Sequence, residues 1–169
     1  LVKANMPIMS AWIKAKQKAV PMSADLTGLD QLVLVTAAGP DGTDWDWGTW
    51  ANARLIKADG SSVWLDELDP DYWVSGSGSI RKNTDLYGNP LLIGGKKLCH
   101  ANGVMVYNIN KEYVRFEAEV GLADQSTVGS VFFRIMNVFP KEEAARLLAA
   151  YPKELGALNA NIDGLENWL

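Results

Sequence analysis

The stretch Tyr113-Val-Arg-Phe-Glu-Ala-Glu-Val120 decides the fold class, because its apolar and charged residues alternate strictly. Successive side chains of an extended strand point to opposite faces of a sheet, so this alternation predicts a β-strand with one buried and one solvated face. The buried face is expected to hold Val114, Phe116, Ala118 and Val120, and the solvated face Arg115, Glu117 and Glu119.

Short apolar runs separated by Gly, Asn, Asp and Pro recur from residue 22 to about residue 138. They predict further strands at 32–36, 50–57, 62–65, 72–75, 90–93, 104–109 and 130–138. Such a series of short strands with frequent turn signals is typical of an antiparallel β-sandwich, and we expect one with jelly-roll character. Within 50–57, alternation places Trp50 on the face of Asn52 and Arg54, as a half-buried anchor.

Helical periodicity appears only at the two ends of the chain. One helical face between residues 6 and 20 would hold Met6, Met9, Trp12, Ile13 and Val20, although Lys16 also falls inside it and Pro21 ends the pattern. Beyond Phe139, Pro140 suits a first helical position and Leu147, Leu148 and Tyr151 supply an apolar stripe. We therefore expect an N-terminal helix in 1–20, a sandwich in 21–138 and a C-terminal helical segment in 139–169.

Composition excludes several classes of protein. A length of 169 residues predicts one domain, and a net charge of −4 with scattered basic residues argues against a nucleic-acid partner. The single cysteine rules out an internal disulfide. The sequence contains no run of about 18 apolar residues, which is the length that could span a membrane. Nucleophile elbows, phosphate loops and zinc-protease motifs are absent from the sequence.

A segment rich in tryptophan and aspartate, residues 39–57, is the strongest candidate for a binding site. Asp41, Asp44 and Asp46 place oxygens two or three residues apart in a loop that contains glycine, which suits calcium. No glutamate follows at the spacing of an EF-hand, so a solvated turn is the alternative. No other cofactor is indicated.

Tryptophans of the same segment could contact a sugar. Trp45 and Trp47 lie in the loop, where an indole can offer its face to the C–H groups of a pyranose. Asn52 and Arg54 lie on the strand that follows, and an amide and a guanidinium suit sugar hydroxyls. Structural pairing of Arg54 with Asp46 or with a sheet-edge carbonyl is the alternative.

Separated strings of the sequence together resemble one known family. They are Trp64-Leu-Asp-Glu-Leu68, Gly88-Asn-Pro-Leu-Leu-Ile-Gly-Gly-Lys96, His100-Ala-Asn-Gly103, Tyr107, Val114-Arg-Phe-Glu-Ala-Glu-Val-Gly121 and Gly129-Ser-Val-Phe-Phe-Arg134. This set is similar to the NPCBM family of carbohydrate-binding modules, which occur attached to glycoside hydrolases and resemble the galactose-binding jelly rolls. The resemblance covers roughly residues 20–138.

The order of the strings departs from the family pattern. The family's closing segment, an apolar strand and a Trp-Ala-(Asp/Asn)-Ala-Arg-Leu strand, has its counterparts at the front of this chain: Thr27-Gly-Leu-Asp-Gln-Leu-Val-Leu-Val35 and Asp46-Trp-Gly-Thr-Trp-Ala-Asn-Ala-Arg-Leu55. Either the module is circularly permuted or the chain joins parts of two copies. We favour permutation, because the two pieces together supply about one complete set of strands.

The resemblance also implies site residues near one end of the sandwich. It places His100, the only histidine, and Asn102 at a polar tip there, which suggests ligand contact, with the structural role of most lone histidines as the alternative. Asp124 matches a family aspartate near the same end, with a turn cap as the alternative. One histidine cannot supply a metal site built on several imidazoles.

We predict a non-catalytic module that binds a terminal, galactose-like sugar through loops at one end of the sandwich. The resemblance implies an extracellular, periplasmic or cell-surface location and a covalently linked glycoside hydrolase. One rival is a structural spacer whose helices dock to a catalytic domain. Another is an enzyme, which would need two carboxylates across a cleft, whereas Asp66, Glu67 and Asp69 fall in a charged turn.

Overall fold

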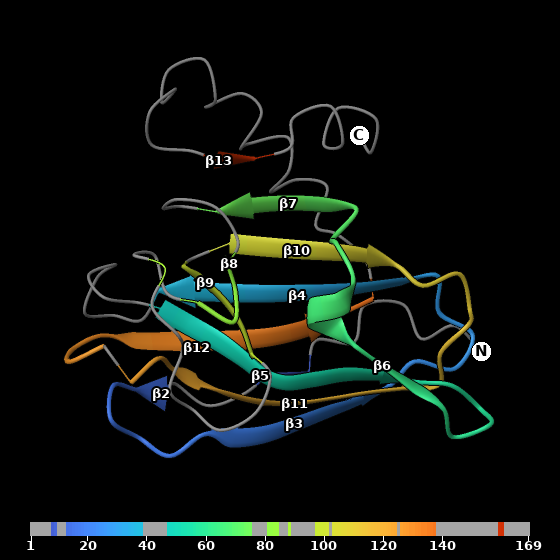
Figure 1. Ribbon diagram of the computed structural model, residues 1–169, viewed down its shortest axis with the longest axis horizontal. Helices are drawn as coiled ribbons and strands as arrows, with labels where there is room; N and C mark the ends of the chain where they lie inside the picture. Colours follow the sequence, from blue (N-terminus) through green and yellow to red (C-terminus); the bar gives the residue numbers. More distant parts are fainter. Residues whose placement is uncertain are drawn as a thin grey trace.

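Two antiparallel sheets pack face to face in the computed structural model (Figure 1). The structure describes residues 8–9, 13–38, 47–75, 81–84, 88, 97–101, 103–124, 126–137 and 159–160, and of these it describes 8–9, 37–38, 47, 74–75, 97–101 and 159–160 by their backbone alone. The predicted fold class, a mainly β antiparallel sandwich, is confirmed.

The first sheet has the order β1-β12-β4-β10-β7-β13, and β2 also pairs with β12. Its strands are β1 (Ile8–Met9), β2 (Ile13–Lys14), β4 (Gln31–Ala38), β7 (Tyr72–Ser75), β10 (Gly103–Asn108), β12 (Ser130–Met136) and β13 (Asn159–Ala160).

The second sheet has the order β3-β11-β5-β9-β8, and β6 also pairs with β5. Its strands are β3 (Val20–Asp25), β5 (Trp47–Ile56), β6 (Ser62–Trp64), β8 (Arg81–Lys82), β9 (Lys97–Ala101) and β11 (Arg115–Leu122). A short 3-10 helix, η1 (Leu65–Glu67), follows β6.

The core lies between the sheets and is centred on aromatic rings from both. Trp50 on β5 meets Phe133 on β12 edge to face, with ring centroids 5.2 Å apart, and Phe116 on β11 lies 6.1 Å from Trp50. All three side chains are fully buried. As the alternation predicts, β11 buries Phe116, Ala118 and Val120 and turns its charged residues outward.

Most predicted strands are found at their expected places, and the segment 90–93 lies outside the described residues. The sequence patterns missed β3, which contains Pro21. β3 forms the edge of the second sheet and pairs only with β11 among the described strands. A proline, which lacks a backbone N–H, is tolerated on such an edge strand.

The predicted N-terminal helix is wrong at the described residues, because Ile8–Met9 and Ile13–Lys14 are strands on β12. Ile13 is buried in the core, and Lys16 adopts a left-handed conformation (φ 68°) that no right-handed helix accommodates. The edge of β12 offers unpaired backbone groups, whereas a short helix gains little stability by itself.

The face predicted for Trp50 is also wrong, because β5 carries a bulge. The register with β11 shifts between Glu117 and Glu119, and Asn52 takes up the extra residue with φ 50°. One extra residue reverses the alternation, so Trp50 points into the core while Asn52 and Arg54 remain on the outer face.

Of the C-terminal segment 139–169, predicted to be helical, the structure describes only Asn159–Ala160, which pair with β7. The rest of that prediction lies outside the described residues. Within the described part of the chain, no helix is long and apolar enough to cross a membrane.

Candidate functional site

A groove of about 710 Å³ runs over the outer face of the second sheet. Neighbouring strands β3, β11, β5 and β6 build it. Its polar lining includes Asn52 and Arg54, both predicted as site residues, together with Glu117, Glu119 and Arg115 from β11. The sheet therefore brings two of the predicted residues together on one surface.

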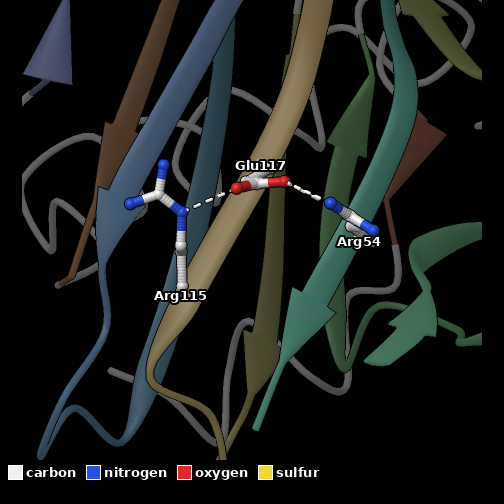
Figure 2. Close-up of polar contacts among 3 residues, drawn as sticks. All are labelled: Arg54, Arg115 and Glu117. Carbon is white, nitrogen blue, oxygen red and sulfur yellow. Dashed lines mark hydrogen bonds and ion pairs between the residues drawn. The ribbon is translucent and has the colours of Figure 1, made fainter. Parts of the chain in front are cut away.

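Glu117 is held between two arginines (Figure 2). Arg54, its direct partner across the β5–β11 pair, donates from Nη2 to Glu117 Oε2 at 2.7 Å and from Nε at 3.1 Å. Arg115, two residues away on β11, donates from Nε to the other oxygen at 2.7 Å. Arg54 thus has a structural partner, which differs from both of the alternatives that the sequence suggested.

These arginines lower the pKa of the Glu117 carboxyl from its usual 4.5. Hydrogen bonding by Arg54 is the largest cause, and the hydrogen bond from Arg115 is the second largest. The carboxyl therefore remains ionised in mildly acidic solution and keeps both guanidinium groups in place. A lowered pKa does not suit a general acid, which needs a raised one.

Asn52 lies beside this cluster and owes its position to the bulge. Its side-chain Nδ2 donates to Glu119 Oε2 at 2.9 Å. Asparagine enters the left-handed region more readily than most residues, which explains why it occupies the bulged position. Bulges commonly re-aim a side chain beside a functional site.

Trp64 completes the groove from β6, where it lies directly opposite Arg54. Its side chain is partly exposed. The sequence patterns did not select Trp64 or Arg115 as site residues. The turn between β5 and β6 could have indicated Trp64, because a turn sets the register of the two strands that it joins and so places Trp64 opposite Arg54. In this turn Gly60 has φ 86° and Ser61 donates to Asp59.

The remaining described site residues lie toward one end of the second sheet, the end to which β4 points (left in Figure 1). In the β5–β9 pair, Gly48 faces His100 and Trp47 faces Ala101; on the other side, Gly48 faces Leu122. The side chains of Trp47 and His100 lie outside the described atoms.

Asp124 lies just beyond Leu122 at the same end. It is exposed, in a turn where Ser126 N donates to Ala123 O at 2.9 Å, and its own carbonyl accepts from Lys16 Nζ at 2.9 Å.

The predicted residues thus fall into two groups. Seven positions separate Trp47 from Arg54, or roughly 23 Å of strand at ~3.3 Å per residue. A single sugar ring cannot span that length. Asn52 and Arg54 belong to the groove, whereas Trp47, His100 and Asp124 occupy the end of the sheet.

Several predicted residues lie outside the described part of the chain: Asp41, Asp44, Trp45, Asp46 and Asn102. The described residues contain no group of three or more His, Cys, Asp or Glu side chains that could hold a metal ion. Two carboxylates considered for catalysis bind neighbours near β8, since Asp69 pairs with Lys82 at 2.5 Å and Asp66 accepts from Asn83 at 2.9 Å.

Comparison with known proteins found a family and one distant structural similarity. A comparison with curated proteins found no match. The SPBc2 prophage-derived protein YomS is similar in structure, with 10% sequence identity, a TM-score of 0.33 and coverage of 78% of this chain and 95% of that chain. The family model described as the NPCBM/NEW2 domain matches residues 5–56 and 61–164.

The two matched segments build one sandwich. β4 lies between β10 and β12, and β5 lies between β11 and β9, so the first segment supplies central strands to both sheets. This arrangement favours one module over parts of two, and circular permutation stays a prediction. The family match covers nearly the whole chain. The chain therefore belongs to the NPCBM/NEW2 domain family of carbohydrate-binding modules.

Proposed function

We propose that this protein binds carbohydrate without acting on it, and that a terminal, galactose-like sugar occupies the end of the sandwich where Trp47, His100 and Asp124 lie. Membership of the carbohydrate-binding family carries the general function. The strand register supports the location, because it brings three chain segments with sugar-binding side-chain types to one end of a sheet.

In this proposal Trp45 or Trp47 stacks on the sugar, and His100, Asn102 and Asp124 bind its hydroxyl groups. One stacked ring and a few hydrogen bonds give weak binding, because association must first offset lost translational and rotational freedom. A linked glycoside hydrolase outside the cell would benefit through local concentration at a glycan surface.

Calcium at Asp41, Asp44 and Asp46 belongs to the same proposal. A hard cation with oxygen ligands would hold the adjacent tryptophans in a fixed position. If calcium has this role, adding EDTA should weaken sugar binding and calcium should restore it. Unchanged sugar affinity in EDTA, with no calcium detected by mass spectrometry, would refute the metal site alone.

Titration calorimetry with a panel of galactosides and other monosaccharides tests the sugar site. We expect galactosides to bind best and Trp47→Ala or His100→Ala to abolish binding. Trp64→Ala, in the separate groove, is the matched tryptophan control and should leave monosaccharide binding unchanged. Absence of binding by the wild-type protein to every sugar would refute the proposed specificity.

A further inference from the structure

We infer that the groove across β3, β11, β5 and β6 is a second carbohydrate site, which takes a neutral oligosaccharide chain in place of a terminal sugar. The inference rests on carbohydrate binding as the function, but not on the site at the end of the sandwich. Two sites on one module would let it hold both a chain end and the chain itself.

The shape of the groove suits a chain. It is open along the sheet face, and its volume of about 710 Å³ lies within the ~300–1,000 Å³ typical of ligand pockets. Part of its floor is sheet backbone, because the side chains of Met22 and Ala118 point into the core. An open trough admits the internal units of an oligosaccharide, which a closed pocket would exclude.

Trp64 supplies an aromatic surface in this groove. It is partly exposed, and it lies across the β5–β6 pair from Arg54. An indole contributes a large contact area at a low cost in conformational entropy, and apolar C–H faces of sugar rings pack against such surfaces. The groove therefore combines one aromatic side chain with a row of hydrogen-bonding groups on the neighbouring strands.

The positive and negative side chains that line the groove are equal in number, and this balance favours a neutral ligand. Its lining contains two arginines and two glutamates: Arg54, Arg115, Glu117 and Glu119. An acidic sugar would meet no net positive charge there and would be repelled by Glu119. Each sugar hydroxyl both donates and accepts hydrogen bonds, so a surface with donors and acceptors in similar number suits it.

Both kinds of group remain available in the groove. Arg54 Nη1 and both Nη atoms of Arg115 make no hydrogen bond to the described residues, so they can donate to a ligand. Glu119 Oε1 and Asn52 Oδ1 likewise make none, so they can accept.

These groups are also fixed before a ligand arrives. Glu117 accepts hydrogen bonds from one nitrogen of Arg115 and two of Arg54, and Glu119 accepts one from Asn52, whose backbone the bulge fixes. Side chains that are already ordered lose less entropy on binding. The cross-strand ion pairs therefore do more than stabilise the sheet, because they orient unused donors over the groove.

Amide NMR of the wild-type protein tests this assignment directly. A neutral galactotetraose should perturb the amides of Ser23, Arg54 and Glu117 and the indole N–H of Trp64. Galactose alone should perturb only the amides of Gly48, Ala101 and Asp124, which the terminal unit of the tetrasaccharide should perturb as well. A tetragalacturonate, the acidic probe of equal length, should leave the groove signals unmoved.

Variants give the second readout. Trp64→Ala should weaken tetrasaccharide binding about tenfold, and Trp64→Phe should retain most of it because an aromatic ring remains. Arg115→Gln should weaken it as well, while Glu112→Gln, an exposed position outside the groove, is the matched control. Thermal unfolding of each variant verifies that it is folded.

Three results would overturn the inference. Tetrasaccharide shifts confined to the end of the sandwich would refute the groove and leave the proposed function intact. Preferential binding of tetragalacturonate in the groove would refute the neutral ligand. Shifts from neither neutral sugar would refute the groove and the proposed galactose-like specificity together.

Discussion

Gly48 shows how tightly one residue can be constrained at the start of β5. A Cβ added at Gly48 would lie 2.5 Å from Thr36 Cγ2 and within 3.3 Å of Val131 and Phe133 atoms. These three neighbours are buried side chains of the opposite sheet. The core leaves no space for a methyl group here, so glycine is required by packing and not by its backbone angles.

Gly48→Ala should therefore destabilise the protein by about 1–3 kcal/mol through overpacking. Urea unfolding followed by circular dichroism measures the loss. Gly121→Ala is the control, since its Cβ would meet Ala19 atoms at ordinary distances of 3.5 and 3.7 Å. Equal stability of the two variants would contradict the packing explanation.

The bulge in β5 is the feature that matters most at the scale of single elements. It sends Trp50 inward, directs Asn52 outward and shifts the register against β11. All of this depends on one residue in the left-handed region, which costs most residues ~1–2 kcal/mol.

Replacing Asn52 separates the backbone requirement from the hydrogen bond to Glu119. Asn52→Ala should lower the free energy of unfolding by about 1–2 kcal/mol, whereas Asn52→Gly should cost clearly less because glycine tolerates φ 50°. Thermal unfolding compares the two. If the two variants cost the same, the hydrogen bond to Glu119, which both of them lose, and not the backbone angle decides the bulge.

Glu117 links β11 to β5 in a way that depends on pH. Its pKa is lowered in the folded protein, so its stabilising effect is present above the usual pKa near 4.5 and is lost as the pH falls through the lowered value. Glu117 is 32% exposed, so solvent screening keeps this effect modest.

Glu117→Gln should therefore lower the unfolding temperature at pH 7 more than at pH 3. Calorimetric melting across that range measures the difference, with Glu112→Gln as a control at an exposed position. A difference that does not change with pH would mean that the two arginines do not bind the carboxylate in solution.

At the scale of the whole molecule, the strands differ in how many partner strands they have and in how long they are. β5 and β11 each have partners on both sides, and they also carry the central aromatic residues of the core. β1 and β2 are two-residue strands that pair with β12. Backbone groups with more partners and more burial open less often.

Amide hydrogen exchange should follow this order. We expect the slowest exchange in β5 and β11, at rates set by global unfolding, and faster exchange in β1 and β2 through local opening. Mass spectrometry of peptic fragments can resolve these segments. Equal protection of Ile13 and Phe116 would show that the N-terminal strands unfold only with the whole sandwich.

Much of this architecture could be predicted because strands have a local period. The alternation in 113–120 correctly placed Phe116 inside and Glu117 outside, and the separated sequence strings identified the family that the match over residues 5–56 and 61–164 confirms. Asn52 and Arg54 were correctly expected on one face. The helical pattern of 6–20 failed, because two short strands fit the edge of β12.

The sandwich class, the outward face of β11 and the family could be predicted from the sequence alone, since each depends on neighbouring residues or on short strings. Strand pairing in the folded protein was needed to place Trp50 in the core, Trp64 opposite Arg54, and Glu117 between Arg54 and Arg115. These features depend on strand register and on a bulge, which arise from pairing between segments that lie far apart in the chain.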